Sequence, residues 1–473
     1  MEEINHDRYR SKDILVVAVP RMIMDWDDRG GLVIIAGVVL FILVIATSFA
    51  FAPVMGIDSE QEKMTLVGSQ GGGPGWHEYG SIYLLEGGEQ IWREASASSY
   101  FDVTVLENGD VLVGFMNSGY SDCELSSGEC VRTGFRIIAG GEDPKVVEEY
   151  SFEVRTGKDS EVHAVSMLPS GEFLISDMDQ ERIFTVKGGE VTWSWEAREL
   201  YDAPKDPTKR DWLHINDVDV IGEDRYLVSV RNANQILIID RNEGVVEIIN
   251  KDYDDSDDAS CKRMGALEDT DGDGNIRCGD PSILNHQHNP QWLGEGKILV
   301  ADSDNDRIVE LHRGESGKWD PVWALYEAGG IDLNWPRDAD KLPSGNILIT
   351  DTLNKRIIEV DPQGKIVWGV WTQFIPYEAD RLPYGEINGI DDMGESNQIE
   401  WGGVGLEDNV KNSEEIGEIG SRGSGVPIIS DLLFITRVLL PEIPYWFKEL
   451  QLIATIISVT MVSIGWKMWR RSG

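Results

Sequence analysis

The sequence predicts an all-β fold, a six-bladed β-propeller, with a transmembrane helix near each end of the chain. Two observations predict the propeller. A strand-turn-strand motif recurs along the chain, and its copies follow one another at intervals of about 50–70 residues, which fits one blade per repeat once insertions are allowed. A third observation predicts the helices, because two uncharged apolar stretches flank the repeats.

Five copies of the motif are clear. Each has an apolar run, a turn with glycine in or beside it, and a second apolar run, an order typical of a β-hairpin. The copies lie at 103–115, 165–177, 218–230, 290–302 and 338–351. A sixth blade is expected because residues 377–387 repeat the pattern of 338–345, while 63–67 and 81–93 supply its outer strands. The predicted propeller domain covers residues 60–390.

The first apolar stretch, residues 31–53, follows a charged leader at 1–30 and is long enough to cross a bilayer. A signal peptide is the alternative, but its apolar region is usually shorter and its leader less charged. The second stretch, residues 449–467, is followed by a basic tail at 468–473. Because both ends are basic and the middle is acidic, both termini are expected in the cytoplasm and the propeller outside the cell.

The segment between the propeller and the second helix divides into two parts. Residues 391–425 are rich in Gly, Glu, Asn and Ser and are expected to form a flexible linker. Residues 426–448 mix apolar residues with a few charges and prolines, so they are expected to form an amphipathic segment along the membrane surface.

The chain is strongly acidic, with a formal net charge of −41 at pH 7. Such a surface repels nucleic acid, so no nucleic-acid partner is expected. The four cysteines fall into two local pairs, Cys123 with Cys130 and Cys261 with Cys278. Both pairs are expected to be disulfides, which require an oxidising compartment. Four free thiols in a cytosolic protein are the alternative.

An insertion at residues 251–280 contains a candidate calcium loop. Asp269, Asp271 and Asp273 occupy positions 1, 3 and 5 of an EF-hand-like pattern, and Gly274 occupies the position of the sharp turn. Asn275 and Asp280 stand at positions 7 and 12, where the usual residue at position 12 is Glu. We expect a structural calcium ion; a solvated acidic loop is the alternative.

Histidine is the most informative residue type in this sequence. His163, His214, His288 and Arg337 all stand at the start of a predicted hairpin, where a propeller strand begins beside the central channel. His286 precedes His288 by two residues, so strand alternation would keep both on one side. These residues are therefore expected to converge in a shared pocket.

A second signature follows the hairpins, in which an Asp is followed five residues later by an Arg. The pairs are Asp177 with Arg182, Asp302 with Arg307, and Asp351 with Arg356. This signature resembles the NHL-type repeat, whose family fold is a β-propeller. The six residues are expected to fix the turn between two strands.

Two motifs, at 211–220 and 286–302, resemble those of bacterial arylsulfate sulfotransferases, which are secreted six-bladed propellers of the arylsulfotransferase family. The resemblance covers roughly residues 60–385. It implies that His214 and His288 bind a sulfuryl group from a small-molecule sulfate ester, with a phenol as acceptor. It also implies Arg307 as a possible partner. His286 and Asn216, which lie in the two motifs, are further candidates for substrate binding.

One departure from the family matters. Its nucleophilic histidine lies in a blade after the second motif, and the matching stretch here, 334–346, contains Arg337 and no histidine. Either His163 or His288 has taken that role, or the activity is lost. Two alternatives therefore stay open: a non-catalytic propeller that binds a ligand or protein, and a lyase or hydrolase in which His163, His214 and His288 bind zinc or another transition metal.

Overall fold

The structure is a computed structural model. It describes residues 29–50, 63–72, 76–125, 128–141, 143–207, 211–252, 261, 267, 277–385, 388–389, 432–433, 436, 447 and 449–472. The predicted linker, and almost all of the predicted leader and of the predicted interfacial segment, lie outside these residues. The chain divides into two compact units, which are described in turn: residues 53–449, and the two ends of the chain.

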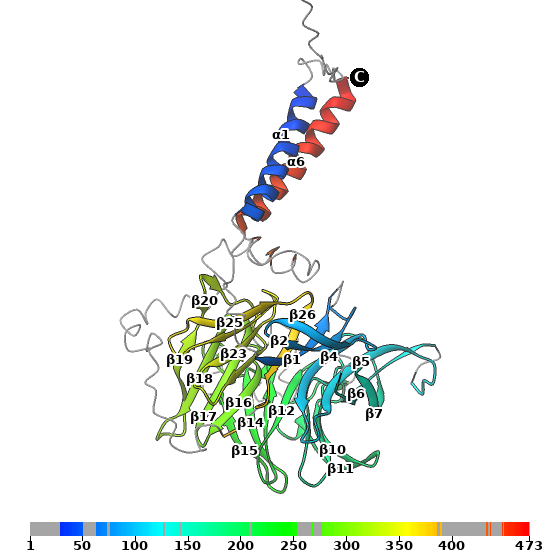
Figure 1. Cartoon of the computed structure of the whole chain (residues 1–473), viewed down its shortest axis with the longest axis vertical. Helices are drawn as coiled ribbons and strands as arrows, with labels where there is room; N and C mark the ends of the chain where they lie inside the picture. Colours follow the sequence, from blue (N-terminus) through cyan, green and yellow to red (C-terminus); the bar gives the residue numbers. More distant parts are fainter. Residues whose placement is uncertain are drawn as a thin grey trace, which may run out of the picture. The chain divides into compact units, whose positions relative to one another are not determined.

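The larger unit is a six-bladed β-propeller, as the repeats predict (Figure 1). Each blade is a sheet of four antiparallel strands joined in sequence by hairpins, except that the first blade takes its first strand from the end of the repeats. In the order of the strands within each sheet, the first blade consists of β26 (Ile375–Arg381), β1 (Met64–Gly71), β2 (Ser81–Glu86) and β3 (Glu89–Glu94), and the second of β4 (Ser99–Val105), β5 (Val111–Tyr120), β6 (Cys130–Ala139) and β7 (Lys145–Val154). The third consists of β8 (Val165–Met167), β9 (Phe173–Asp177), β10 (Arg182–Lys187) and β11 (Glu190–Glu196), and the fourth of β12 (Ile215–Gly222), β13 (Arg225–Val230), β14 (Gln235–Asp240) and β15 (Gly244–Ile249). The fifth consists of β16 (His288–Gly294), β17 (Lys297–Asp302), β18 (Arg307–Arg313) and β19 (Trp319–Leu325), and the last of β22 (Asp338–Lys341), β23 (Ile347–Asp351), β24 (Arg356–Val360) and β25 (Ile366–Trp371).

Three short 3₁₀ turns and a small ribbon complete the described propeller. The turns are η1 (Ala197–Glu199), η3 (Arg231–Ala233) and η4 (Ser303–Asn305). The ribbon pairs β20 (Glu327–Ala328) with β21 (Ile331–Asp332).

The ring is closed by pairing the two ends of the repeat region. β26 pairs antiparallel with β1, with Asp380 opposite Leu66 and Ala379 opposite Val67. This first blade is the one that the sequence predicted as the sixth, because it combines the strands predicted at 63–67 and 81–93 with the segment predicted at 377–387. Closure of this kind satisfies the edge of β1, which would otherwise be unpaired.

The first strands of the blades lie beside one another around the ring. β4 contacts β26, β26 contacts β22, and the contacts continue through β16 and β12 to β8. These six strands therefore line the propeller axis, and a residue at the start of one strand lies near residues at the starts of others.

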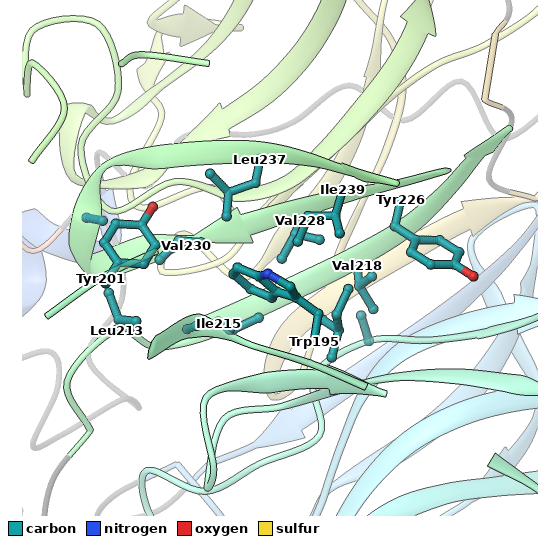
Figure 2. Packing of buried hydrophobic residues seen from close by; sticks show 14 of the residues in the cluster. Trp195, Tyr201, Leu213, Ile215, Val218, Tyr226, Val228, Val230, Leu237 and Ile239 are labelled. Atoms are coloured by element: carbon teal, nitrogen blue, oxygen red, sulfur yellow. The ribbon is translucent and has the colours of Figure 1, made fainter. Parts of the chain in front are cut away.

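Apolar side chains fill the space between neighbouring blades. In the largest core cluster, Leu174 and Trp195 of one blade meet Val218 and Val228 of the next, and Trp195 is 3% exposed (Figure 2). Burial of a tryptophan side chain contributes about 4–6 kcal/mol at roughly 25 cal/mol per Å² of buried surface. This packing makes the ring a rigid support for the residues at the ends of its strands.

The Asp/Arg signature forms ion pairs across the turn between the second and third strands of three blades. The Nε–Oδ2 distance is 2.8 Å for Arg182 with Asp177, 2.7 Å for Arg307 with Asp302 and 2.6 Å for Arg356 with Asp351. Two of these arginines also donate to backbone carbonyls earlier in the chain: Arg307 to those of Ser282 and Ile283, and Arg356 to those of Ala328 and Ile331. The structural role predicted for these pairs fits this geometry.

Both predicted disulfides are present. Cys123–Cys130 links the ends of β5 and β6, and Cys261–Cys278 brackets the insertion that carries the candidate calcium loop. No free cysteine remains in the chain.

The smaller unit consists of α1 (Arg29–Ala50) and α6 (Glu449–Ser472), both long and apolar enough to cross a membrane. They pack antiparallel through glycines. A Cβ on Gly30 would lie 2.9 Å from the carbonyl oxygen of Gly465, and a Cβ on Gly37 would lie 2.9 Å from that of Ser458. The Ser458 hydroxyl donates to the Gly37 carbonyl at 2.8 Å. Such close approach between small residues is typical of paired transmembrane helices.

Candidate functional site

One residue from the start of the first strand of each blade contributes to a single cluster. These residues are Phe101, His163, His214, His288, Arg337 and Tyr377, in chain order. The ring centroids of His163 and His214 lie 5.5 Å apart, and Tyr377 lies 5.1 Å from His163 and 6.3 Å from His288. The guanidinium carbon of Arg337 lies 4.9 Å from the Tyr377 ring centroid. With His286, which is described below, we call these residues the histidine cluster.

Bulges at the starts of the strands help to direct these side chains. The pairing register shifts between Tyr100 and Val103 in β4, between Ile215 and Asp217 in β12, and between His288 and Gln291 in β16. A bulge turns a side chain away from the regular alternation and is frequent beside binding sites. The segment before β16 is also irregular: His286 has a φ of 49° and precedes the strand. The strand alternation expected for His286 and His288 therefore does not apply.

His214 is held in a left-handed backbone conformation, with a φ of 57°. Such a conformation is unfavourable for a residue with a Cβ and needs support from its surroundings. Glu181 supplies it, because its carboxyl oxygens accept hydrogen bonds from the amides of four consecutive residues, 212–215. The imidazole is oriented by Asp211, whose Oδ2 lies 2.5 Å from Nδ1.

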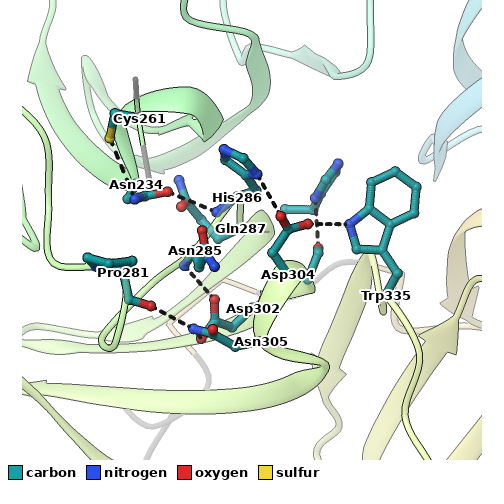
Figure 3. A network of polar contacts seen from close by, with 12 residues as sticks. Asn234, Cys261, Pro281, Asn285, His286, Gln287, Asp302, Asp304, Asn305 and Trp335 are labelled. Atoms are coloured by element: carbon teal, nitrogen blue, oxygen red, sulfur yellow. Dashed lines mark hydrogen bonds and ion pairs between the residues drawn. The ribbon is translucent and has the colours of Figure 1, made fainter. Parts of the chain in front are cut away.

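The same pairing of carboxylate and imidazole occurs at His286. Its Nδ1 lies 2.8 Å from Asp304 Oδ2, and the other oxygen of Asp304 accepts a hydrogen bond from Trp335 Nε1 at 3.0 Å (Figure 3). His288 is oriented differently, because its Nδ1 lies 2.8 Å from the hydroxyl of Ser303. Nε2 of His286 is buried and forms no hydrogen bond within the described residues.

His163 lies near the buried carboxylate of Glu161. Its Nδ1 is buried and has no hydrogen-bond partner among the described residues. Nearby Glu161 is 2% exposed and pairs with His77, with 3.0 Å between Oε1 and Nε2. Burial alone would raise the pKa of Glu161, but the hydrogen bond from His77 lowers it below its ordinary value. This carboxylate is therefore ionised near neutral pH.

The imidazoles of His163, His214 and His288 have the same charge state. Burial lowers the pKa of each well below 6.5, and the charges of Arg231 and Arg337 lower it further. All three rings are neutral near pH 7, with a nitrogen lone pair available. A neutral imidazole is the form that acts as a nucleophile, a base or a metal ligand.

Arg337 is enclosed by aromatic rings. Its guanidinium carbon lies 4.6 Å from the ring centroid of Trp335 and 5.4 Å from that of Trp76, and it donates a hydrogen bond to Gln70. Burial lowers the pKa of Arg337 to about 10, so the group remains charged at neutral pH. The positive charge of Arg337 therefore acts on the neighbouring imidazoles of His214 and His288.

The two other predicted binding residues lie in different surroundings. Asn216 is fully buried beside the cluster, where its Nδ2 donates to the Gln287 carbonyl at 2.9 Å and its own carbonyl accepts from the Tyr377 hydroxyl. Arg307 is engaged by Asp302, by the Tyr326 hydroxyl and by two backbone carbonyls. This geometry favours the structural role for Arg307.

Metal sites were predicted at two places. Of the candidate calcium ligands, Asp280 is described and caps a turn by accepting hydrogen bonds from the amide and hydroxyl of Ser282. Asp269, Asp271, Asp273 and Asn275 lie outside the described residues. Among the residues described, the one group of three His, Cys, Asp or Glu side chains with ligand atoms within 4.8 Å of one another is Cys123, Cys130 and Glu153, and these cysteines are a disulfide. His163, His214 and His288 do not form such a group in the described structure.

The fold and this site define a class: a six-bladed β-propeller that gathers histidines and arginine where its first strands begin. Within this class, residues 146–317 match the model of the arylsulfotransferase (ASST) family. The matched region contains His163, His214 and His288 and ends before Arg337. The resemblance inferred from the two motifs is therefore confirmed for this part of the chain.

Solved structures with similar folds include a protein of unknown function from Bacteroides caccae, with 15% identity, a TM-score of 0.44 and coverage of 68% of this chain and 98% of that one. The periplasmic gluconolactonase of Pseudomonas aeruginosa has 12% identity and a TM-score of 0.39, over 67% and 98% of the two chains. The virginiamycin B lyase of Staphylococcus aureus has 11% identity and a TM-score of 0.31, over 57% and 68%. A search of the curated proteins found no match.

Proposed function

We propose that this protein is a membrane-anchored sulfotransferase that moves a sulfuryl group from an aryl sulfate to a phenol by way of a histidine. The observation that carries the proposal is the convergence of three neutral imidazoles, from three blades, beside a buried arginine. The family match over residues 146–317 supports the reaction class. Sulfuryl transfer needs a neutral nitrogen nucleophile and cations for the anionic transition state, and the cluster supplies both.

His214 is the best candidate for the nucleophile. Because Asp211 stands at Nδ1, that nitrogen carries the proton and Nε2 carries the lone pair. Burial raises the pKa of Asp211 to about 6, and the charges of Arg231 and Arg155 act in the opposite direction; the carboxylate form of Asp211 would stabilise positive charge on the ring. The side chain of His214 is 12% exposed, against 1% for His286, so His214 is the more accessible of the two carboxylate-bound imidazoles.

The proposed reaction has two steps. In the first, Nε2 of His214 attacks sulfur, an N–S bond forms, the S–O bond to the aryl group breaks, and the phenolate leaves. In the second, the acceptor hydroxyl attacks sulfur and gives its proton to solvent, the N–S bond breaks, and the neutral imidazole is restored; the phenolate released in the first step takes up a proton from solvent, so the two steps balance. Arg337 remains charged throughout and stabilises the negative charge that spreads over the sulfuryl oxygens.

Substitution of His214 tests this proposal. The full chain in detergent is incubated with 4-nitrophenyl sulfate and a phenol acceptor, and a radiolabelled donor is used to trap sulfohistidine. His214→Ala is expected to abolish turnover and the label, and Asp211→Asn to lower kcat by about a hundredfold or more because the ring loses its tautomer.

His312→Ala is the matched control, since His312 pairs with Glu310 on β18 and its side chain is 37% exposed. Turnover that survives in His214→Ala moves the role to His163 or His288. If the wild type shows neither turnover nor labelled histidine, the proposal is wrong and the alternative of a non-catalytic propeller is favoured.

We also propose that both chain ends are cytoplasmic and the propeller is outside. The antiparallel packing of α1 and α6 supports this, because it brings the start of α1 beside the end of α6. The two disulfides support an oxidising compartment for the propeller.

We further propose that the insertion binds a structural calcium ion through Asp269, Asp271, Asp273, Asn275 and Asp280. The Cys261–Cys278 disulfide supports the proposal, because it ties the two ends of the loop together. Calorimetric titration of the EDTA-treated full chain is expected to show one calcium per chain, and Asp271→Asn is expected to remove most of the heat. Titration of the wild type without heat would exclude the site.

A further inference from the structure

A group of buried carboxyl side chains follows the histidine cluster along the first strands of the blades. Asp102 lies on β4, Asp338 on β22, and Glu378 and Asp380 on β26. All four residues are buried, and none of them takes part in the reaction proposed above. Because these strands line the propeller axis, we call the four residues the axial acids.

Two of the axial acids lie in contact with each other. The carboxyl groups of Asp102 and Glu378 are within hydrogen-bonding range. Each also accepts a hydrogen bond from a backbone amide of the next blade: Asp102 Oδ2 from Val165 at 2.7 Å, and Glu378 Oε1 from Val103 at 3.2 Å. Two carboxylates in such contact repel each other unless a proton or a cation lies between them.

The cationic side chains of the described structure do not supply this positive charge to Asp102 or Asp380. Both oxygens of Asp380 are buried and accept no hydrogen bond, and the charges that act on it are those of Asp338 and Asp102. Burial raises the pKa of Asp102 to about 6 and that of Asp338 to about 7. Near neutral pH, a proton and a bound cation would therefore compete for these carboxyl groups.

A buried neutral oxygen beside the pair distinguishes a cation from a proton. Asn289, which follows His288 on β16, donates from Nδ2 to Glu378 Oε2 at 3.0 Å. Its Oδ1 is buried and accepts no hydrogen bond within the described residues. A proton shared by Asp102 and Glu378 would leave this amide oxygen unsatisfied. A cation would bind it together with the two carboxylates, since hard cations take carboxylate and amide oxygens as ligands.

We propose that a structural calcium ion is bound at the propeller axis by Asp102, Glu378 and Asn289, with Asp338 and Asp380 adding negative charge. Calcium accepts irregular sets of oxygen ligands, whereas magnesium demands a near-ideal octahedron and keeps several waters. The three ligands come from three blades, so the ion would join these blades at the axis. The site is separate from the insertion at 251–280, and it does not depend on sulfuryl transfer.

The metal content of the full chain in detergent tests the proposal. The Asp271→Asn protein is the parent, so that the calcium loop of the insertion does not contribute. Because the axial ligands are buried, a chelator reaches the ion slowly, and the EDTA-treated parent is expected to retain one calcium per chain by mass spectrometry of the acid digest. The calcium counted in the titration of the insertion is thus a second ion.

Asp102→Asn in this parent is expected to lose the ion, because the amide keeps an acceptor for Val165 but loses the charge. Glu378→Gln is expected to do the same and replaces Asp102→Asn if that variant does not fold. Asp320→Asn is the matched control: it removes a carboxylate from β19, where the side chain of Asp320 is 57% exposed, and is expected to retain the ion.

Thermal unfolding at pH 8 gives a second measurement that does not depend on the recovery of metal. If a cation is bound, Asp102→Asn removes a ligand and is expected to lower the Tm of the parent. If the pair shares a proton instead, the same substitution removes a repulsion between two buried carboxylates and raises the Tm.

Loss of calcium from Asp102→Asn, its retention in Asp320→Asn and a lowered Tm support the axial site. A parent without a bound divalent ion overturns it, as does a folded Asp102→Asn protein that keeps its calcium or has a higher Tm. An ion that is lost from His288→Ala but retained in Asp102→Asn would belong to the histidine cluster and would also overturn the proposal.

Discussion

At the scale of single residues, the sequence predicted the histidines and the arginine of the cluster, but it did not predict Phe101 and Tyr377 or the groups that orient the imidazoles. His163, His214, His288 and Arg337 could be selected because each precedes a repeated hairpin, and equivalent places in a propeller are neighbours around the axis. Glu181 could not be selected, because it lies in the blade before His214 and acts on backbone amides. The sequence did distinguish Arg231, whose charge acts on the imidazoles, because the other three copies of the Asp/Arg turn signature have Met178, Ser303 and Thr352 at the equivalent position.

The buried neutral histidines predict how stability depends on pH. The pKa of His288 is well below 6.5 in the folded chain, first because of burial and then because of Arg337 and Arg231. Below pH 6.5 the unfolded chain binds a proton that the folded chain does not, so the stabilisation present above pH 6.5 is lost as the pH falls. The slope is at most about 1.4 kcal/mol per pH unit for each histidine.

Thermal unfolding of wild type and His288→Gln between pH 5 and 8 measures this effect. The stability difference between the two proteins is expected to be largest above pH 6.5 and to shrink toward pH 5. A difference that is constant across this range would contradict the assignment of a neutral, buried imidazole.

At the scale of elements, the hairpins followed from local patterns, whereas the outer strands did not. β8–β9 and β22–β23 combine alternating apolar residues with a turn, and the sequence predicted both. The outer strands, such as β7, expose much of their surface and lack a repeated motif, so their bounds emerge only from pairing with the preceding strand. The β20–β21 ribbon has too few residues for periodicity to indicate it.

The three Asp/Arg pairs differ in burial, and this predicts an order of stability effects. Both partners of Asp351–Arg356 are fully buried, whereas Arg182 is 28% exposed. Removal of one partner from a buried pair leaves an uncompensated charge and costs about 3–5 kcal/mol. Arg356→Ala is therefore expected to destabilise the protein by about that amount, and Arg182→Ala by less. Thermal or urea unfolding of the two variants gives the comparison, and equal losses would show that burial does not govern these pairs.

At the scale of the whole molecule, the sequence predicted six blades and two terminal helices. The blade count required the recognition that residues 377–387 complete a sheet begun at 63–67, which the repeat pattern allowed. Hydropathy located both helices, but it carried no information about their partners. The contact between Gly37 and Ser458 joins residues from opposite ends of the chain, and only the three-dimensional structure reveals it.

The proposed topology predicts which surfaces an impermeant reagent reaches. Lys145→Cys lies on β7, where the lysine side chain is 70% exposed, and it is expected to react with a membrane-impermeant maleimide in intact cells. Ser472→Cys, at the end of α6, is expected to react only after lysis. The parent chain, whose four cysteines are paired, is the background control. Labelling of Ser472→Cys in intact cells would reverse the orientation.

The pairing of β26 with β1 has a consequence for biosynthesis. β1 emerges from the ribosome long before residue 375, so the amides and carbonyls on the edge that later pairs with β26 wait for a partner that does not yet exist. Until that partner arrives, the nascent chain presents a free strand edge that can pair with another molecule. The ring therefore closes only late in synthesis, and a chaperone that covers this edge would protect the chain most during that interval.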